Sequence, residues 1–89
     1  IVFMHVPRYD PRGGNYHHCL PDESSDRLIR LFLKYRASHI FASHIHGYFE
    51  GKWKGIPYTI TGGAGTALAG YDPDHDFFHF LKVLMIMSI

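Results

Sequence analysis

Hydrophobic and polar positions divide the chain into two parts of different character. In the first part, short apolar runs at residues 1–5 and 40–42 predict two strands that are buried on both faces. In the second part, residues 48–61 alternate apolar and polar side chains, which predicts a hairpin with Ile56, Tyr58 and Ile60 on one face. The turn of this hairpin is expected either at residues 50–52 or at Lys54 and Gly55.

A helix is predicted between the two buried strands. Ser24 or Ser25 can cap its N-terminus, acidic residues cluster at its start, and basic residues gather towards its end. A stripe of apolar side chains at helical spacing is expected to pack against the sheet, and it consists of Leu28, Leu31, Phe32 and Tyr35. Before the helix, prolines and glycines in residues 6–25 predict a long loop, and loops of this length are usually functional or mobile.

The remaining elements complete an α/β (α+β) fold class. Residues 61–65 form a glycine-rich loop, and residues 77–86 are predicted to form a long final strand. The glycine-rich loop lacks the lysine of a nucleotide-binding loop and precedes no clear helix, so we expect it to serve tight backbone turning. The order is therefore strand, loop, helix and strand, followed by a hairpin and a final strand.

Composition and charge narrow the class of protein. Eighty-nine residues make one domain, and 46% hydrophobic against 19% charged residues suit a packed core. A net charge of +1 gives no indication of nucleic-acid binding. Cys19 is the only cysteine, which excludes an internal disulfide, and no apolar run is long enough to cross a membrane. We therefore expect a cytoplasmic protein without a membrane segment.

Histidines stand at the ends of both buried strands. His5 ends the first strand, and His44 and His46 follow the second, within a total of eight histidines. Open α/β sheets bind ligands at the carboxyl ends of their strands, and neutral imidazole is a good ligand for zinc, iron and manganese. The residues alone leave two interpretations open: a metal site, or strand-end histidines that are hydrogen-bonded to the backbone.

Three segments together resemble the C-terminal half of calcineurin-like metallophosphoesterases. They are Val2-Phe3-Met4-His5-Val6-Pro7, His39-Ile40-Phe41-Ala42-Ser43-His44-Ile45-His46-Gly47-Tyr48 and Gly55-Ile56-Pro57-Tyr58-Thr59-Ile60-Thr61-Gly62-Gly63-Ala64-Gly65. The resemblance implies a four-layer αββα sandwich with a dinuclear centre of manganese, iron or zinc. It also implies that His5 and His44 bind one metal and His46 the other, and that phosphate mono- or diesters are hydrolysed.

The chain departs from that family in two respects. Ser43 stands where the last family motif has glycine, and the acidic N-terminal motifs Asp-x-His, Gly-Asp-x-x-Asp and Gly-Asn-His are absent. Because those motifs supply the bridging carboxylate, we expect residues 1–89 to be a single partial domain that is inactive by itself. The apolar first and last residues, Ile1 and Ile89, fit that expectation. Half a sheet also exposes an edge strand, which predicts a homodimer.

The long loop before the helix supplies further candidate residues for substrate binding. Arg8, His17 and His18, with Arg12, could contact a phosphate-ester substrate from the long loop, and no catalytic residue is singled out. The remaining histidines are expected to be structural, as is Cys19. The alternative to a phosphoesterase is a non-catalytic metal-binding module or a self-associating structural module.

Overall fold

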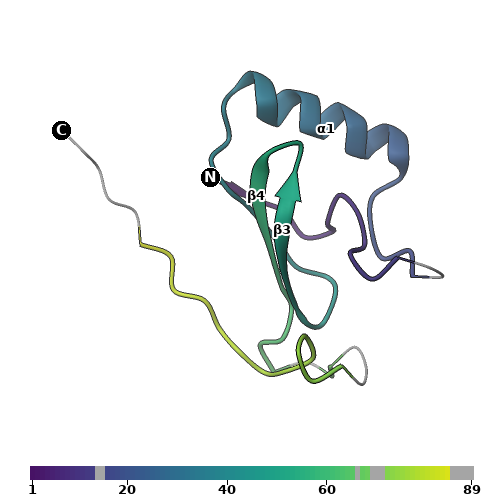
Figure 1. Cartoon of the computed structure of the whole chain (residues 1–89), viewed down its shortest axis with the longest axis vertical. Coiled ribbons are helices and arrows are strands. Elements are labelled where there is room, and N and C mark those ends of the chain that lie inside the picture. The colour runs from purple at the N-terminus through teal and green to yellow at the C-terminus, as the bar shows by residue number, and fades with distance from the viewer. Residues whose placement is uncertain (14–15, 66, 69–71, 85–89) are drawn as a thin grey trace.

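A computed structural model describes residues 1–13, 16–65, 67–68 and 72–84. These residues form a small α+β domain with one helix and a mixed four-stranded sheet (Figure 1). The elements, in chain order, are β1 (Val2–Phe3), α1 (Asp22–Lys34), β2 (Ile40–Ala42), β3 (Tyr48–Trp53) and β4 (Ile56–Thr61). The expected α+β class is therefore confirmed.

The sheet has the strand order β1-β2-β4-β3. β2 pairs in parallel with both β1 and β4, whereas β3 and β4 form the predicted antiparallel hairpin. The hairpin turns at Lys54 and Gly55, whose φ angles of 50° and 84° are both positive, as the tight two-residue turns of hairpins require. The alternative turn at residues 50–52 is therefore wrong, because those residues lie inside β3.

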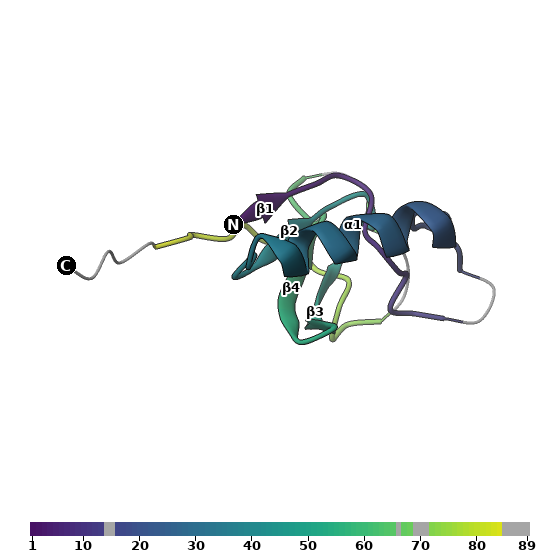
Figure 2. The same ribbon diagram turned by 90° about the horizontal axis from the view of Figure 1, so that it is seen from above.

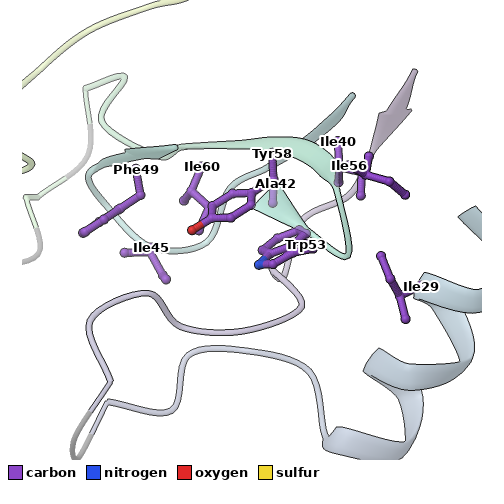
Figure 3. Packing of buried hydrophobic residues seen from close by; sticks show 9 residues of the cluster. All are labelled: Ile29, Ile40, Ala42, Ile45, Phe49, Trp53, Ile56, Tyr58 and Ile60. Carbon is purple, nitrogen blue, oxygen red and sulfur yellow. The ribbon is translucent and has the colours of Figure 1, made fainter. Parts of the chain in front are cut away.

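The hydrophobic core lies between α1 and one face of the sheet, as Figure 2 shows from above. Ile29 from the helix points towards the sheet, and Trp53 stacks on Tyr58 with ring centroids 4.0 Å apart (Figure 3). The buried hydrophobic residues are Ile29, Ile40, Ala42, Ile45, Phe49, Trp53, Ile56, Tyr58 and Ile60. Ile56, Tyr58 and Ile60 therefore share the buried face of the hairpin, as the alternation predicted.

The structure contains the predicted helix, but the helix begins at a different residue and buries a different face than predicted. α1 begins at Asp22, directly after Pro21, and no side chain caps it. Pro21 has a φ of −56° but an extended ψ of 148°, so the helical conformation begins only at Asp22. Ser25 and Ile29 are the buried positions, whereas Leu31 and Tyr35 are 53% and 71% exposed. Phe32 packs against the core beside Ile29, so only part of the predicted apolar stripe is covered.

Two strand predictions need correction. β1 is not buried on both faces, because Phe3 lies in the edge strand of the described sheet and is 72% exposed. Residues 77–84 contain no strand and form no ladder with either edge strand of the described sheet, β1 or β3. They leave the domain as an extended segment (Figure 1), while residues 85 and 86 of the predicted strand lie outside the described residues.

No helix in the described residues is long and apolar enough to cross a membrane.

Candidate functional site

Parallel pairing of β1 with β2 brings His5 and His44 together. The pairing continues past both strands, because Met4 donates to the Phe41 carbonyl (2.9 Å) and the Ser43 N–H donates to the His5 carbonyl (2.8 Å). His44 has a positive φ of 64°, an uncommon left-handed conformation at the end of β2. Its Nδ1 lies 3.4 Å from His5 Nε2, with the two rings edge to face.

His18 approaches the opposite side of the His44 ring. Its Nδ1 lies 3.2 Å from His44 Nε2, and the ring centroids are 5.3 Å apart. His44 therefore has a different histidine at each of its two ring nitrogens, and the three rings form a row. The described residues contain no group of three or more His, Cys, Asp or Glu side chains placed to hold a metal ion.

His46 is oriented by a backbone contact. Its Nδ1 lies 2.6 Å from the carbonyl oxygen of Ala67, so Nδ1 carries the proton and donates, leaving Nε2 as the acceptor nitrogen. Metal-binding histidines usually donate their second nitrogen to such a carbonyl, which fixes the tautomer. Between the two histidines, Ile45 is buried in the core, so the alternation of the loop leaves His44 and His46 outside the core.

The geometry fits part of a metal centre. Two imidazole nitrogens on one tetrahedral zinc ion stand about 3.3–3.4 Å apart, since the metal–nitrogen bonds are about 2.0–2.1 Å long. The 3.4 Å between His5 Nε2 and His44 Nδ1 matches that separation. The contact of His46 Nδ1 with the Ala67 carbonyl leaves Nε2 as the nitrogen of that ring that can accept. His5 and His44 therefore have the nitrogen spacing of two ligands on one ion, but no third ligand-type side chain among the described residues joins them in a metal-binding group.

The surroundings of His44 favour its neutral ring. Partial desolvation acts first, and the neighbouring rings of His5, His18 and His46 together with the Arg12 guanidinium add positive charge, so the pKa of His44 lies below its ordinary value. A neutral imidazole is the form that binds metals.

A pocket of about 320 Å³ lies beside these histidines. Its lining residues are Arg12, Tyr16, His18, His44, Ile45 and His46. The pocket therefore joins the loop before α1 to the segment that follows β2, which are far apart in the sequence.

Asp10 anchors the loop side of this pocket. Its carboxylate accepts hydrogen bonds from Arg12 Nε (2.9 Å) and Nη2 (2.8 Å) and from the backbone N–H groups of Arg12 and His18. The Asp10 side chain is only 2% exposed. Burial acts to raise the pKa of Asp10, but the hydrogen bonds from Arg12 and from the two N–H groups outweigh it, so this pKa lies below its ordinary value.

Two of the expected substrate contacts lie elsewhere. Arg8 is buried against α1, where its Nη2 donates to Asp26 (3.2 Å), and it does not line the pocket. His17 is exposed and also lies outside the pocket lining, whereas His18 is part of it. Asp10 and Tyr16 were not singled out from the sequence. The close spacing of Asp10 and Arg12, two residues apart around a proline, is the one signal that pointed to the ion pair.

The remaining histidines make contacts within the fold. His39 Nε2 lies 2.9 Å from Thr59 Oγ1, and His79 Nε2 lies 2.7 Å from Thr61 Oγ1. His75 stacks on Phe49 with ring centroids 4.3 Å apart. Cys19 is a free, half-buried thiol. These positions suit the structural roles that were expected.

Comparisons with protein-family models, with curated proteins and with solved structures gave no match for this chain. The family resemblance therefore depends on the quoted motifs alone.

Proposed function

We propose that this chain forms part of a metal-dependent phosphoesterase that hydrolyses phosphate mono- or diesters. In this proposal His5 and His44 hold one metal ion, and His46 holds the other. The sheet and α1 would form part of a four-layer αββα sandwich. The observation that carries the proposal is the 3.4 Å approach of His5 Nε2 to His44 Nδ1, at the ends of adjacent parallel strands and beside a pocket.

The residues of the chain have separate tasks in this proposal. His5 Nε2 and His44 Nδ1 face each other at 3.4 Å, and the Ala67 carbonyl accepts from His46 Nδ1, which orients the His46 ring. The buried Ile45 holds the loop between them in place. When bound, two such metal ions neutralise charge on a phosphoryl group and lower the pKa of a coordinated water.

The acidic motifs of the family are missing from this sequence, so the chain alone is proposed to be inactive. The row formed by His18, His44 and His5 supports this view, because it leaves each metal with fewer protein ligands than the usual three or four. The proposal therefore predicts metal binding without hydrolysis.

Metal content per chain tests the proposal. Purified protein is equilibrated with zinc, manganese or iron, freed of excess metal and subjected to elemental analysis, together with a His44→Ala/His46→Ala double variant. His17→Ala is the control, since His17 lies outside the pocket lining. We expect about one zinc per chain in the wild type and in His17→Ala, and none in the double variant. Equal metal content in all three proteins, or none in the wild type, would contradict the proposal.

A further inference from the structure

Arg12 is the most firmly positioned cation of the pocket. Its Nε and Nη2 donate to the two oxygens of Asp10, and its guanidinium lies over the Tyr16 ring, 4.2 Å from the centroid. The carboxylate fixes the guanidinium within its plane, and the ring fixes the orientation of that plane. Arg12 therefore reaches the pocket in one orientation before any ligand arrives.

This arrangement leaves donors available on the side of the guanidinium away from Asp10. A guanidinium has five N–H groups, and Asp10 takes one from Nε and one from Nη2, so the two N–H groups of Nη1 and one of Nη2 remain. The Asp10 contact also raises the pKa of Arg12, which keeps it charged. The described lining residues include no acidic side chain, and among the described residues Asp76 is the one further carboxylate near enough to act on the Arg12 charge.

His18 extends this donor surface towards the candidate metal ligands. Its backbone N–H donates to the same Asp10 carboxylate, and its ring lies beside His44. One buried carboxylate thus positions both Arg12 and His18. A guanidinium edge with a neighbouring imidazole is a typical recognition surface for phosphate oxygens.

We propose that Arg12, positioned by Asp10 and Tyr16 and assisted by His18, binds the terminal phosphate of a phosphomonoester in this pocket. This inference builds on the proposed function for the identity of the substrate, but the anion site exists without metal. A phosphomonoester has three non-bridging oxygens and up to two negative charges, whereas a diester has two such oxygens and one charge. The larger negative charge favours the monoester at the Arg12 guanidinium even without metal, and where two oxygens face the metal ligands only the monoester retains one for Arg12.

Metal-free protein in a chelator provides the test, with methyl phosphate and dimethyl phosphate as probes at constant ionic strength set with chloride. Binding is followed by ¹H–¹⁵N NMR at Arg12 Nε–H and at the His18 amide. We expect saturable shifts with methyl phosphate, at least fivefold weaker binding of dimethyl phosphate, and at least tenfold weaker binding of methyl phosphate in Arg12→Gln. Arg27→Gln, at an exposed position of α1, should bind like the wild type.

Two further variants separate position from charge. Arg12→Lys keeps the positive charge but loses the planar set of N–H donors. Asp10→Asn keeps Arg12 but weakens the carboxylate contact that orients it. Both variants should therefore bind methyl phosphate more weakly than the wild type. Absence of saturable shifts in the folded wild type would overturn the inference, as would unchanged affinity in Arg12→Gln or equal affinity for the two probes. Methyl phosphate binding that persists while the chain fails to bind metal would refute the metal proposal alone and support this one.

Discussion

Gly62 controls how closely the loop after β4 approaches the histidine segment. A Cβ atom at this position would overlap the carbonyl oxygen of Ile45 and stand 2.8 Å from its carbonyl carbon and 3.2 Å from His46 Cα. All three atoms belong to the backbone, so no side-chain rotation relieves the contact. Gly62→Ala must therefore displace residues 45–46, and His46 with them.

The expected cost follows from this overlap. Inserting a methyl group into a packed site costs about 1–3 kcal/mol when the backbone has to move. For a domain of this size, that lowers the melting temperature by roughly 5–20 °C, at about 4–8 °C per kcal/mol. Disturbing the groups that hold a metal ligand in place typically lowers metal affinity by about 10–100-fold, so we also expect weaker zinc binding at neutral pH.

Thermal unfolding followed by circular dichroism, combined with zinc titration, measures both effects. Gly55→Ala is the matched control: its φ is 84° and a Cβ there meets open space, so only backbone strain of about 1–2 kcal/mol is expected. Gly55→Ala should lower stability and leave zinc affinity unchanged. A Gly62→Ala protein with wild-type melting temperature and zinc affinity would refute the reasoning.

Three further predictions concern other parts of the domain. The pKa of Asp10 in the folded protein lies below its unfolded value near 3.8, so ionised Asp10 stabilises the fold above that pH. This stability is lost as the pH falls through the folded pKa. The difference in stability between wild type and Asp10→Asn should therefore shrink between about pH 6 and about pH 2 in thermal unfolding. Trp53→Ala removes the ring that stacks on Tyr58 and should cost about 3–5 kcal/mol in urea unfolding; a loss below about 1 kcal/mol would contradict this packing. Phe3→Lys places a charge on the exposed edge strand and should weaken self-association in analytical ultracentrifugation, whereas an unchanged association constant would argue against dimerisation through β1.

Local patterns predicted most of the sheet because each pattern has one strong physical cause. The alternation in residues 48–61 follows from one buried hairpin face, and Gly55 readily adopts one of the two positive φ angles of the turn, while Lys54 takes the other at 50°. The buried face of α1 was not predictable in the same way. Ser25 is polar and yet fully buried, whereas Leu31 is 53% exposed, so polarity along the helix does not mark its buried face.

The prediction of a final strand was wrong for a different reason. Residues 77–84 carry the composition of a strand, but a strand needs a neighbour, and the described chain pairs this segment to the domain through single contacts such as that of the His79 N–H with the Gly63 carbonyl (3.2 Å). Pairing depends on partners that a local pattern does not contain.

The candidate site also has one part that local patterns predicted and one part that they did not. The approach of His5 to His44 follows from two parallel strands that end side by side, which the sequence pattern anticipated. The part that the loop plays in the site could not be predicted in this way. The Asp10 carboxylate accepts from the backbone N–H of His18, eight residues later, and the Leu20 N–H donates to the Pro7 carbonyl (2.9 Å). Such closures depend on the folded path of an irregular loop, which carries no periodic signal.

The claim that His5 Nε2 and His44 Nδ1 bind the same metal ion is tested most directly by long-range ¹H–¹⁵N NMR of the histidine rings during zinc titration. We expect the ¹⁵N chemical shifts of these two nitrogens to change as they do on zinc coordination, together with that of His46 Nε2 when a second ion binds. The chemical shifts of the His39 ring should stay unchanged. Zinc-induced shifts at other ring nitrogens, or unchanged shifts at His5 Nε2 and His44 Nδ1 with saturating zinc, would contradict it.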